Sequence, residues 1–192
     1  MPMRYLRRFR QDETAAVALE AVIITPVLAW AFIGSFVGFD AFRTYNTSIK
    51  ATYAIADVLS RQSATIYPRD IEGYTDIFEH MVRNDGNARL RATQISYDAD
   101  SDTFRVDWSH ATNGEARLFT ANLIDYEGLL PTMADAETIL LVETFIPYTP
   151  ALEIGMNLTT FENATFTRPR FAGQVPFDPV DPVAPDPVAP AS

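Results

Sequence analysis

The first sixty residues carry the strongest hydrophobic pattern of the chain. Residues 21–39 read AVIITPVLAWAFIGSFVGF and contain no charged side chain. At a rise of about 1.5 Å per residue, a helix of about 19 residues nearly crosses the hydrocarbon core of a bilayer, which is about 30 Å thick. After Arg43 the pattern becomes one-sided, with apolar residues at helical spacing. We therefore predict one long helix over 15–61 whose first part spans a membrane.

Two other interpretations of the apolar run are less favourable. A cleaved secretory signal has an apolar region of about 7–15 residues and a small-residue cleavage site after it. The run here is longer, and the residues that follow it, Asp40-Ala41-Phe42-Arg43, do not resemble such a site. A helix of a soluble protein rarely carries apolar residues on every face over this length. We expect the helix to remain with the protein as an anchor.

The chain beyond residue 61 alternates between short amphipathic and strand-like segments. Residues 70–83 place apolar side chains on one helical face, and Asn84-Asp85-Gly86-Asn87 is a turn signal that closes this predicted helix. The region Gly114 to Met133 is ambiguous. Segments rich in β-branched and aromatic residues predict strands; they are 90–97, 103–108, 137–148 and 158–168.

These elements define an α+β fold class. We predict a long N-terminal transmembrane helix followed by a small antiparallel-sheet head with one further helix. The last residues repeat Asp-Pro-Val, a composition with few apolar groups to bury and few backbone donors, so we predict an extended, disordered tail. The predicted organisation is a cytoplasmic leader over 1–14, the membrane helix and its extension over 15–61, the head over 62–173 and the Pro-rich disordered tail over 174–192.

Charge is distributed unevenly along an acidic chain, whose net charge is −10. The positive charges of the N-terminus are Arg4, Arg7, Arg8 and Arg10, whereas the part after Arg61 is mainly acidic. An acidic head argues against nucleic-acid binding, which needs a basic surface. Arginines beside a membrane span favour the cytoplasmic side. We therefore expect a cytoplasmic N-terminus and a head on the other side of the membrane.

Two features of the apolar helix are candidates for contacts with other chains. Glu20 is a lone acid directly before the charge-free run. It lies either in the headgroup region or beside a positive charge supplied by another chain, because a carboxylate at depth costs a few kcal/mol. Gly34 and Gly38 form a G-x-x-x-G pattern, which allows two helices to approach closely.

The sequence predicts no catalytic, cofactor-binding or metal-binding residues. It has no cysteine, and its two histidines, His80 and His110, lie far apart. Residues 98–102 (DADSD) resemble the first half of a calcium loop, but Thr103 and Ser109 stand where glycine and glutamate are needed. A solvated hairpin turn is the simpler interpretation. No P-loop, dinucleotide or G-x-S-x-G motif is present.

The stretch AAVALEAVIITP resembles the start of TadE/TadG-like pilus-assembly proteins, the pseudopilins of the tight-adherence system. In that family a basic leader precedes a cleavage site, a glutamate and an apolar helix with a proline six residues after the glutamate. Glu20 and Pro26 have this spacing, and the resemblance implies cleavage between Ala15 and Ala16. Ala15 and Ala21 stand where the family usually has glycine and an aromatic residue.

The resemblance implies a structural function without catalysis. The chain would be a minor pilin-like component that assists assembly or anchoring of tight-adherence pili, with its head in the periplasm and a single pass through the bacterial inner membrane. Its partners would be other pilus-assembly subunits and a prepilin peptidase, and in pilin-like families the retained glutamate pairs with the N-terminal amine of a neighbouring subunit. The alternative is a single-pass envelope protein whose acidic domain binds a soluble partner or ligand. A membrane-tethered hydrolase would need a clustered nucleophile and base, which the sequence does not contain.

Overall fold

The computed structural model describes residues 13–83, 87–126, 128–150, 152 and 159–182. The chain divides into two compact units. The first comprises Met1–Arg43 and Pro150–Asn157, and the second comprises Thr44–Thr149 and Leu158–Ser192. We call the second unit the head. Most of the predicted leader, residues 1–12, lies outside the described residues.

The helices lie close to their predicted positions. Helix α2 spans Glu13–Ser60 and passes through Pro26 without ending. Helix α3 spans Pro68–Val82 and begins two residues earlier than the apolar pattern suggests. Proline suits the first turn of a helix because that turn leaves its N–H groups without intrahelical partners. The Asp70 carboxylate accepts a hydrogen bond of 2.8 Å from the Tyr67 amide, which closes this start. The helix ends at Val82, and Arg83 caps it in the left-handed conformation with φ of 57°.

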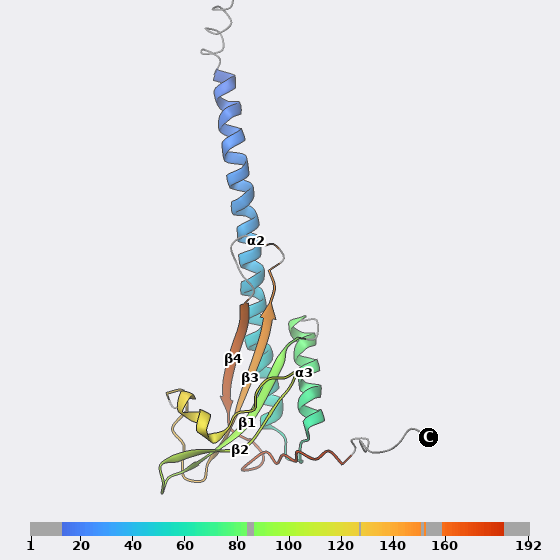
Figure 1. Ribbon diagram of the computed structural model, residues 1–192, viewed down its shortest axis with the longest axis vertical. Helices are drawn as coiled ribbons and strands as arrows, with labels where there is room; N and C mark the ends of the chain where they lie inside the picture. Colours follow the sequence, from blue (N-terminus) through green and yellow to red (C-terminus); the bar gives the residue numbers. More distant parts are fainter. Residues whose placement is uncertain (1–12, 84–86, 127, 151, 153–158, 183–192) are drawn as a thin grey trace, which may run out of the picture. The chain divides into compact units, whose positions relative to one another are not determined.

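Four antiparallel strands form one sheet in the head (Figure 1). The order of the strands is β2-β1-β3-β4, so a long connection leads from the edge strand β2 to the central strand β3. This arrangement confirms the α+β class with a long N-terminal helix, an antiparallel sheet and one further helix. The strands are β1 (Arg89–Asp98), β2 (Thr103–Ala111), β3 (Thr138–Tyr148) and β4 (Thr159–Thr167).

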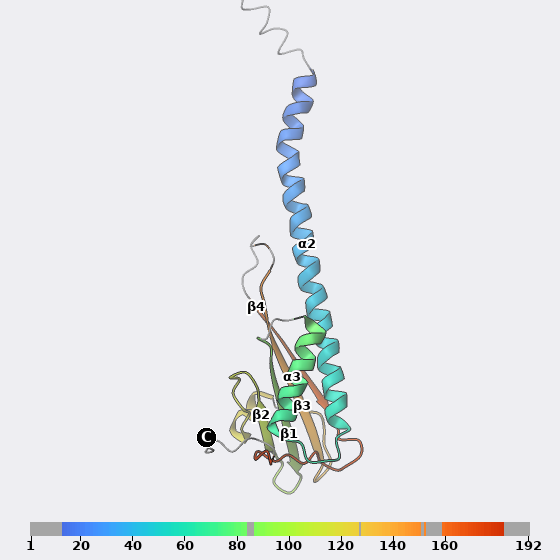
Figure 2. The same ribbon diagram turned by 90° about the vertical axis from the view of Figure 1, so that its right-hand side faces the viewer.

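One face of the sheet is covered by helices (Figure 2). The last turns of α2 contribute Ala51, Ile55 and Leu59 to a core that also contains Ile71 and Phe78 of α3. The head therefore begins within α2 rather than after residue 61. The strand residues in this core alternate along β1 and β3, as expected where one sheet face is packed; they are Leu90, Ala92, Leu140, Val142 and Ile146.

The opposite face is covered by the connection between β2 and β3. This connection contains the short 3-10 helix η1, Thr120–Tyr126, in the region that the sequence leaves ambiguous. Its residues Leu118, Leu123 and Met133 pack against Ile95 and Ile139 of the central strands. Because both faces are covered, β3 is buried over most of its length. This explains why its sequence is an almost continuous apolar run.

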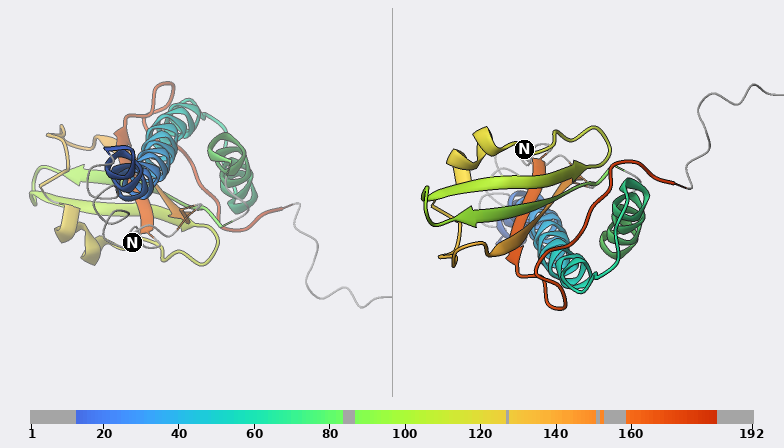
Figure 3. Two further views of the ribbon diagram at one scale, coloured as in Figure 1. Left: turned by 90° about the horizontal axis from the view of Figure 1, so that it is seen from above. Right: turned by 90° about the horizontal axis from the view of Figure 1, so that it is seen from below.

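The predicted disordered tail from residue 174 is wrong for residues 174–182. We call these residues the strap; in Figure 3 it is the red segment that leads to the C-terminal trace. Val175 is fully buried, and Ile66 forms a parallel β-bridge with Phe177. The prediction failed because the composition is poor in apolar groups on average, whereas Val175 and Phe177 are enough to fix a short segment on the core. Residues 183–192 lie outside the described part.

Candidate functional site on the apolar half of helix α2

The apolar half of helix α2 presents a large hydrophobic surface. Between Val17 and Phe36 nearly every residue is exposed. This stretch lies in the one described helix that is long and apolar enough to span a membrane. Apolar patches of this extent mark contacts with lipid or with other proteins. The large side chains that are more than half exposed include Val17, Leu19, Val22, Val27, Leu28, Trp30, Phe32 and Phe36.

Glu20 is an exposed carboxylate on this helix. At about 3.6 residues per turn, a position 18 residues further along lies about five turns away on the same face. Gly38 is at that position, and Gly34 lies one turn before it. The helix therefore places the three residues named from the sequence along one stripe. Gly38 has open space where a side chain would begin, which leaves the backbone accessible to a partner helix.

One small side chain lies on the stripe just before the glycines. Ala31 lies on the same face, and the Ser35 hydroxyl donates a hydrogen bond of 2.9 Å to its carbonyl oxygen. Such a bond satisfies a hydroxyl group inside an apolar segment without any outside partner. Ala15 and Ala16, the residues of the implied cleavage site, lie in the first turn of α2. The structure thus brings Glu20 and the glycines to one face.

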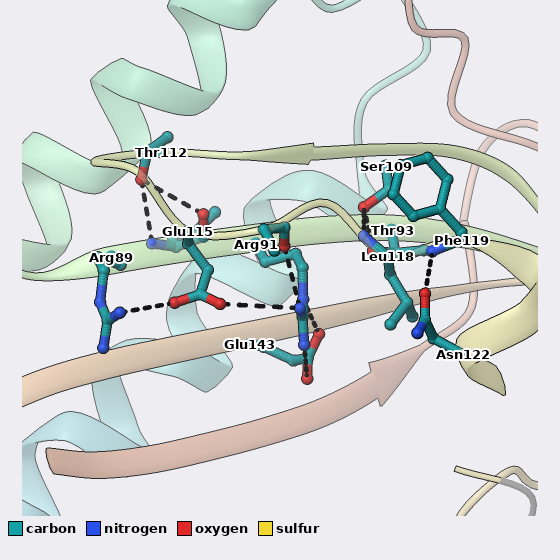
Figure 4. A network of polar contacts seen from close by, with 12 residues as sticks. Arg89, Arg91, Thr93, Ser109, Thr112, Glu115, Leu118, Phe119, Asn122 and Glu143 are labelled. Carbon is teal, nitrogen blue, oxygen red and sulfur yellow. Dashed lines mark hydrogen bonds and ion pairs between the residues drawn. The ribbon is translucent and has the colours of Figure 1, made fainter. Parts of the chain in front are cut away.

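The head contains a buried polar network that the sequence did not predict (Figure 4). Arg91 of β1 and Glu143 of β3 are partners in the strand register. The Arg91 Nε and Nη2 atoms donate to the two carboxylate oxygens at 2.6 and 2.7 Å. Tyr126 of η1 donates from its hydroxyl to Glu143 Oε1 at 2.7 Å and accepts from Arg91 Nη2 at 2.8 Å.

A second acid extends this network along the sheet. Glu115 lies 2.8 Å from Arg89 Nη1 and 3.9 Å from Arg91 Nη1. The Arg91 Nη1 atom also donates to the Ala116 carbonyl oxygen at 3.1 Å. The network therefore ties the connection between β2 and β3 to the central strands. Its signal in the sequence is Glu143, a single acid inside an apolar strand.

The electrostatics of the network fit a structural role. Burial acts to lower the pKa of Arg91, but hydrogen bonding and attraction to Glu143 outweigh it and raise that pKa. Burial is the main cause that raises the pKa of Tyr126 to about 12, and its hydrogen bond to Glu143 adds to it. The tyrosine therefore stays a neutral donor near neutral pH. In the described part of the chain, every buried side-chain nitrogen and oxygen has a hydrogen-bond partner.

The Asp-rich turn between β1 and β2 is a hydrogen-bonded hairpin turn. Asp98 Oδ1 accepts from the Asp100 amide at 3.0 Å, and Asp102 Oδ1 accepts from the Tyr97 hydroxyl at 2.8 Å. Asp102 has a φ of 49°, the left-handed conformation that aspartate tolerates in turns. Among the described residues, no three His, Asp or Glu side chains gather in a way that could hold a metal ion.

The two histidines lie in separate places. His80 is an exposed residue of α3, whereas the ring of His110 on β2 lies 5.8 Å from the ring of Phe177. Burial lowers the pKa of His110; Glu72 opposes this shift, and Arg117 adds to it. His110 is therefore part of the surface on which the strap lies, a role that no motif in the sequence indicates.

Comparison with known proteins found no matching family model, curated protein or solved structure. The fold and the surface of the chain define its class. It has a small α+β head with a sheet covered on both faces, together with a long helix whose exposed apolar half, residues 17–36, carries one carboxylate, Glu20.

Proposed function

We propose that this chain is a membrane-anchored, minor pilin-like (pseudopilin) component that assists assembly or anchoring of tight-adherence pili. The observation that carries the proposal is the exposed apolar half of α2 with Glu20 at its start and Pro26 six residues later. An exposed apolar surface of this length needs lipid or other helices around it. The basic leader before the helix supports an orientation with the N-terminus in the cytoplasm and the head in the periplasm.

Glu20 is the residue that would link one subunit to another. A carboxylate within an apolar bundle is stabilised by a positive partner, and the amine released by cleavage after Ala15 would be such a partner. The face that Glu20 shares with Gly34 and Gly38 supports close packing of helices along the same stripe. The partners would be other pilus-assembly subunits, and a prepilin peptidase would remove the leader. The bacterial inner membrane would hold the chain in a single pass, and we propose no catalytic activity for it.

The direct test replaces Glu20 with glutamine, which keeps the shape and removes the charge. We expect Glu20→Gln to insert into membranes like the unaltered chain but to lose pilus assembly and co-purification with its partners. Asp40→Asn is a matched control, because it removes a carboxylate at the other end of the apolar run. Full assembly of the Glu20→Gln chain would contradict a pairing role for this charge.

A second measurement tests processing. Mass spectrometry of the chain from native membranes should find an N-terminus at Ala16. An intact leader would instead favour the alternative function, an envelope protein whose periplasmic domain binds a soluble partner or ligand. One observation is relevant to that alternative: an open groove of about 440 Å³ on the head, lined by Pro131, Ile139, Phe166, Thr167, Arg168, Pro169 and Arg170. Arg168 and Arg170 pair with Glu137 and Asp57 of the head, so the groove offers an acidic ligand no unpaired arginine.

A further inference from the structure

The head holds the backbone of the strap through side chains of the sheet. The Val175 amide donates to Gln94 Oε1 at 2.8 Å, and the Val175 carbonyl oxygen accepts from Trp108 Nε1 at 2.9 Å. Gln94 belongs to β1 and is only 2% exposed, and Trp108 belongs to β2. Both peptide groups of one strap residue are thus bound by the head, as in the recognition of an extended peptide.

The strap also pairs with the segment before α3. The Ile66 amide donates to the Pro176 carbonyl oxygen at 2.9 Å, and the Asp178 amide donates to the Ile66 carbonyl oxygen at 3.0 Å. These bonds make a short parallel pair, the arrangement in which an added strand is bound through its main chain.

Side chains of the strap also make specific contacts with the head. The Phe177 ring stacks on Trp108, with ring centroids 4.8 Å apart and an interplanar angle of 21°. The Asp181 carboxylate lies 3.0 Å from Arg69 Nη1 at the start of α3. Buried Val175, the aromatic stack and the ion pair occur in order along an extended segment. We call the surface formed by Ile66, Arg69, Gln94, Trp108 and His110 the strap groove.

The chain before the strap is fixed to the head. The Arg170 amide donates to the Ser60 carbonyl oxygen at 2.8 Å, and the Thr138 hydroxyl donates to the Gly173 carbonyl oxygen at 2.5 Å. The strap follows β4, the last strand, so it can leave its groove without unpairing any strand of the sheet. Its nine residues, 174–182, reach about 30 Å when fully extended.

We propose that the strap groove is a recognition site for an extended Val-Pro-Phe-Asp segment, and that a second copy of this chain supplies that segment when heads lie side by side. A strap from a second copy makes the same hydrogen bonds, stack and ion pair as the chain's own strap. The state with the chain's own strap and the state with an exchanged strap therefore have the same contacts, and differ mainly in which chain supplies the strap. The local concentration of heads then decides how often exchange occurs, as in domain swapping. This inference does not depend on the proposed role in pilus assembly.

The test uses the absence of cysteine from the chain. Tyr67 and Asp178 follow the bridged residues Ile66 and Phe177. Cysteines at these two positions should therefore be able to form a disulfide between the strap and the strap groove. In a full chain with both Tyr67→Cys and Asp178→Cys, an internal disulfide shows that the chain's own strap is bound in the strap groove. Two differently tagged full chains, one with Tyr67→Cys and one with Asp178→Cys, report exchange by a disulfide between copies.

We expect the mixed chains, purified in detergent, to form this disulfide-linked dimer. The dimeric fraction should increase with protein concentration, because a strap from a second copy competes with the chain's own strap, whose effective concentration is in the millimolar range. A mixture of Tyr67→Cys with Val180→Cys is the matched control, because Val180 is 71% exposed and should link at least tenfold less. An internal disulfide in the double variant, with no specific dimer at any concentration, would overturn exchange between copies.

A second arm tests the groove without a competing strap. A chain that ends at Gly173 and carries Tyr67→Cys is mixed with a synthetic peptide of residues 174–182 that carries Asp178→Cys. We expect cross-linking that falls about tenfold when the peptide also carries Phe177→Ala, a change equivalent to about 1.4 kcal/mol. Equal cross-linking by both peptides, from a truncated chain that keeps its native circular dichroism, would contradict recognition by the groove. If that chain does not fold, the experiment with two full chains decides.

Discussion

Arg91 and Glu143 face each other across the two central strands and form a two-pronged ion pair that is nearly closed to solvent. Their side chains are 10% and 6% exposed, and both nitrogen–oxygen distances are below 2.8 Å. Loss of one partner leaves the other buried charge without its main counter-charge, a change that typically costs about 3–5 kcal/mol. The pair fixes the register of β1 and β3 and, through Tyr126, holds η1 on the sheet.

We predict that Glu143→Gln lowers the free energy of unfolding by about 3 kcal/mol. The measurement is denaturation of the full chain in detergent, followed by near-ultraviolet circular dichroism. A double variant, Arg91→Met with Glu143→Leu, should recover most of the lost stability, because it removes both charges and fills the same space. Wild-type stability of the Glu143→Gln chain would show that the pair makes no net contribution.

The strap should contribute to the stability of the head. We predict that Phe177→Ala lowers the free energy of unfolding by about 2 kcal/mol, since the change removes apolar burial and the stack on Trp108. Thermal denaturation should then shift by several degrees. Val180→Ala is the control, because Val180 is mostly exposed and should change the midpoint little. Equal midpoints for the two variants would mean that the stack contributes no stability.

Stability should also depend on pH through His110. Its pKa in the folded head is lowered from the usual 6.5, so the folded head favours the neutral ring. As pH falls below 6.5, the unfolded chain binds a proton at this site more readily than the folded chain, and stability decreases. The decrease ends once pH is below the folded pKa.

We therefore expect His110→Gln to flatten the dependence of unfolding free energy on pH just below 6.5. His80→Gln, which changes an exposed histidine on α3, is the matched control for the loss of a histidine. Denaturant titrations at a series of pH values would measure both slopes. The same slope in the His110→Gln chain would assign the pH dependence to other groups.

The proposed orientation makes a prediction about topology. A reporter fused after Ser192 should be active only if it is of the periplasmic type, because arginines beside a membrane span favour the cytoplasmic side. Replacement of Arg7, Arg8 and Arg10 by glutamine should produce chains of mixed orientation. Activity of a strictly cytoplasmic reporter at the C-terminus of the unaltered chain would reverse the proposed topology.

Local patterns in the sequence were sufficient for the fold class and for the approximate positions of α2, α3 and the four strands, but not for η1. The charge-free run marked the exposed helix, and segments rich in β-branched and aromatic residues marked β1 and β3. These local patterns could not predict which side chains far apart in sequence contact each other. Arg91 and Glu143 become neighbours only through the pairing of β1 with β3, and Gln94 meets Val175 only after the whole head has folded. Composition alone also led to the wrong prediction of disorder for the strap, because two apolar residues, Val175 and Phe177, are enough to pack it on the head.

The candidate stripe on α2 was partly predictable for the same reason. Glu20, Gly34 and Gly38 lie on one helix, so helical periodicity is enough to place them on a common face. Their proposed roles depend on partner chains, for which a single sequence contains no direct signal.

The strand order has a consequence for biosynthesis. The central strand β3 cannot meet β1 until the chain beyond residue 138 has been made, and β4 and the strap follow still later. Until then the apolar faces of the β1–β2 hairpin and the last turns of α2 lack their main covering. Non-local pairing of this kind slows folding and leaves hydrophobic surface exposed on the nascent chain. The head should therefore need protection by chaperones until its synthesis is complete, and chains interrupted before residue 138 should be readily degraded.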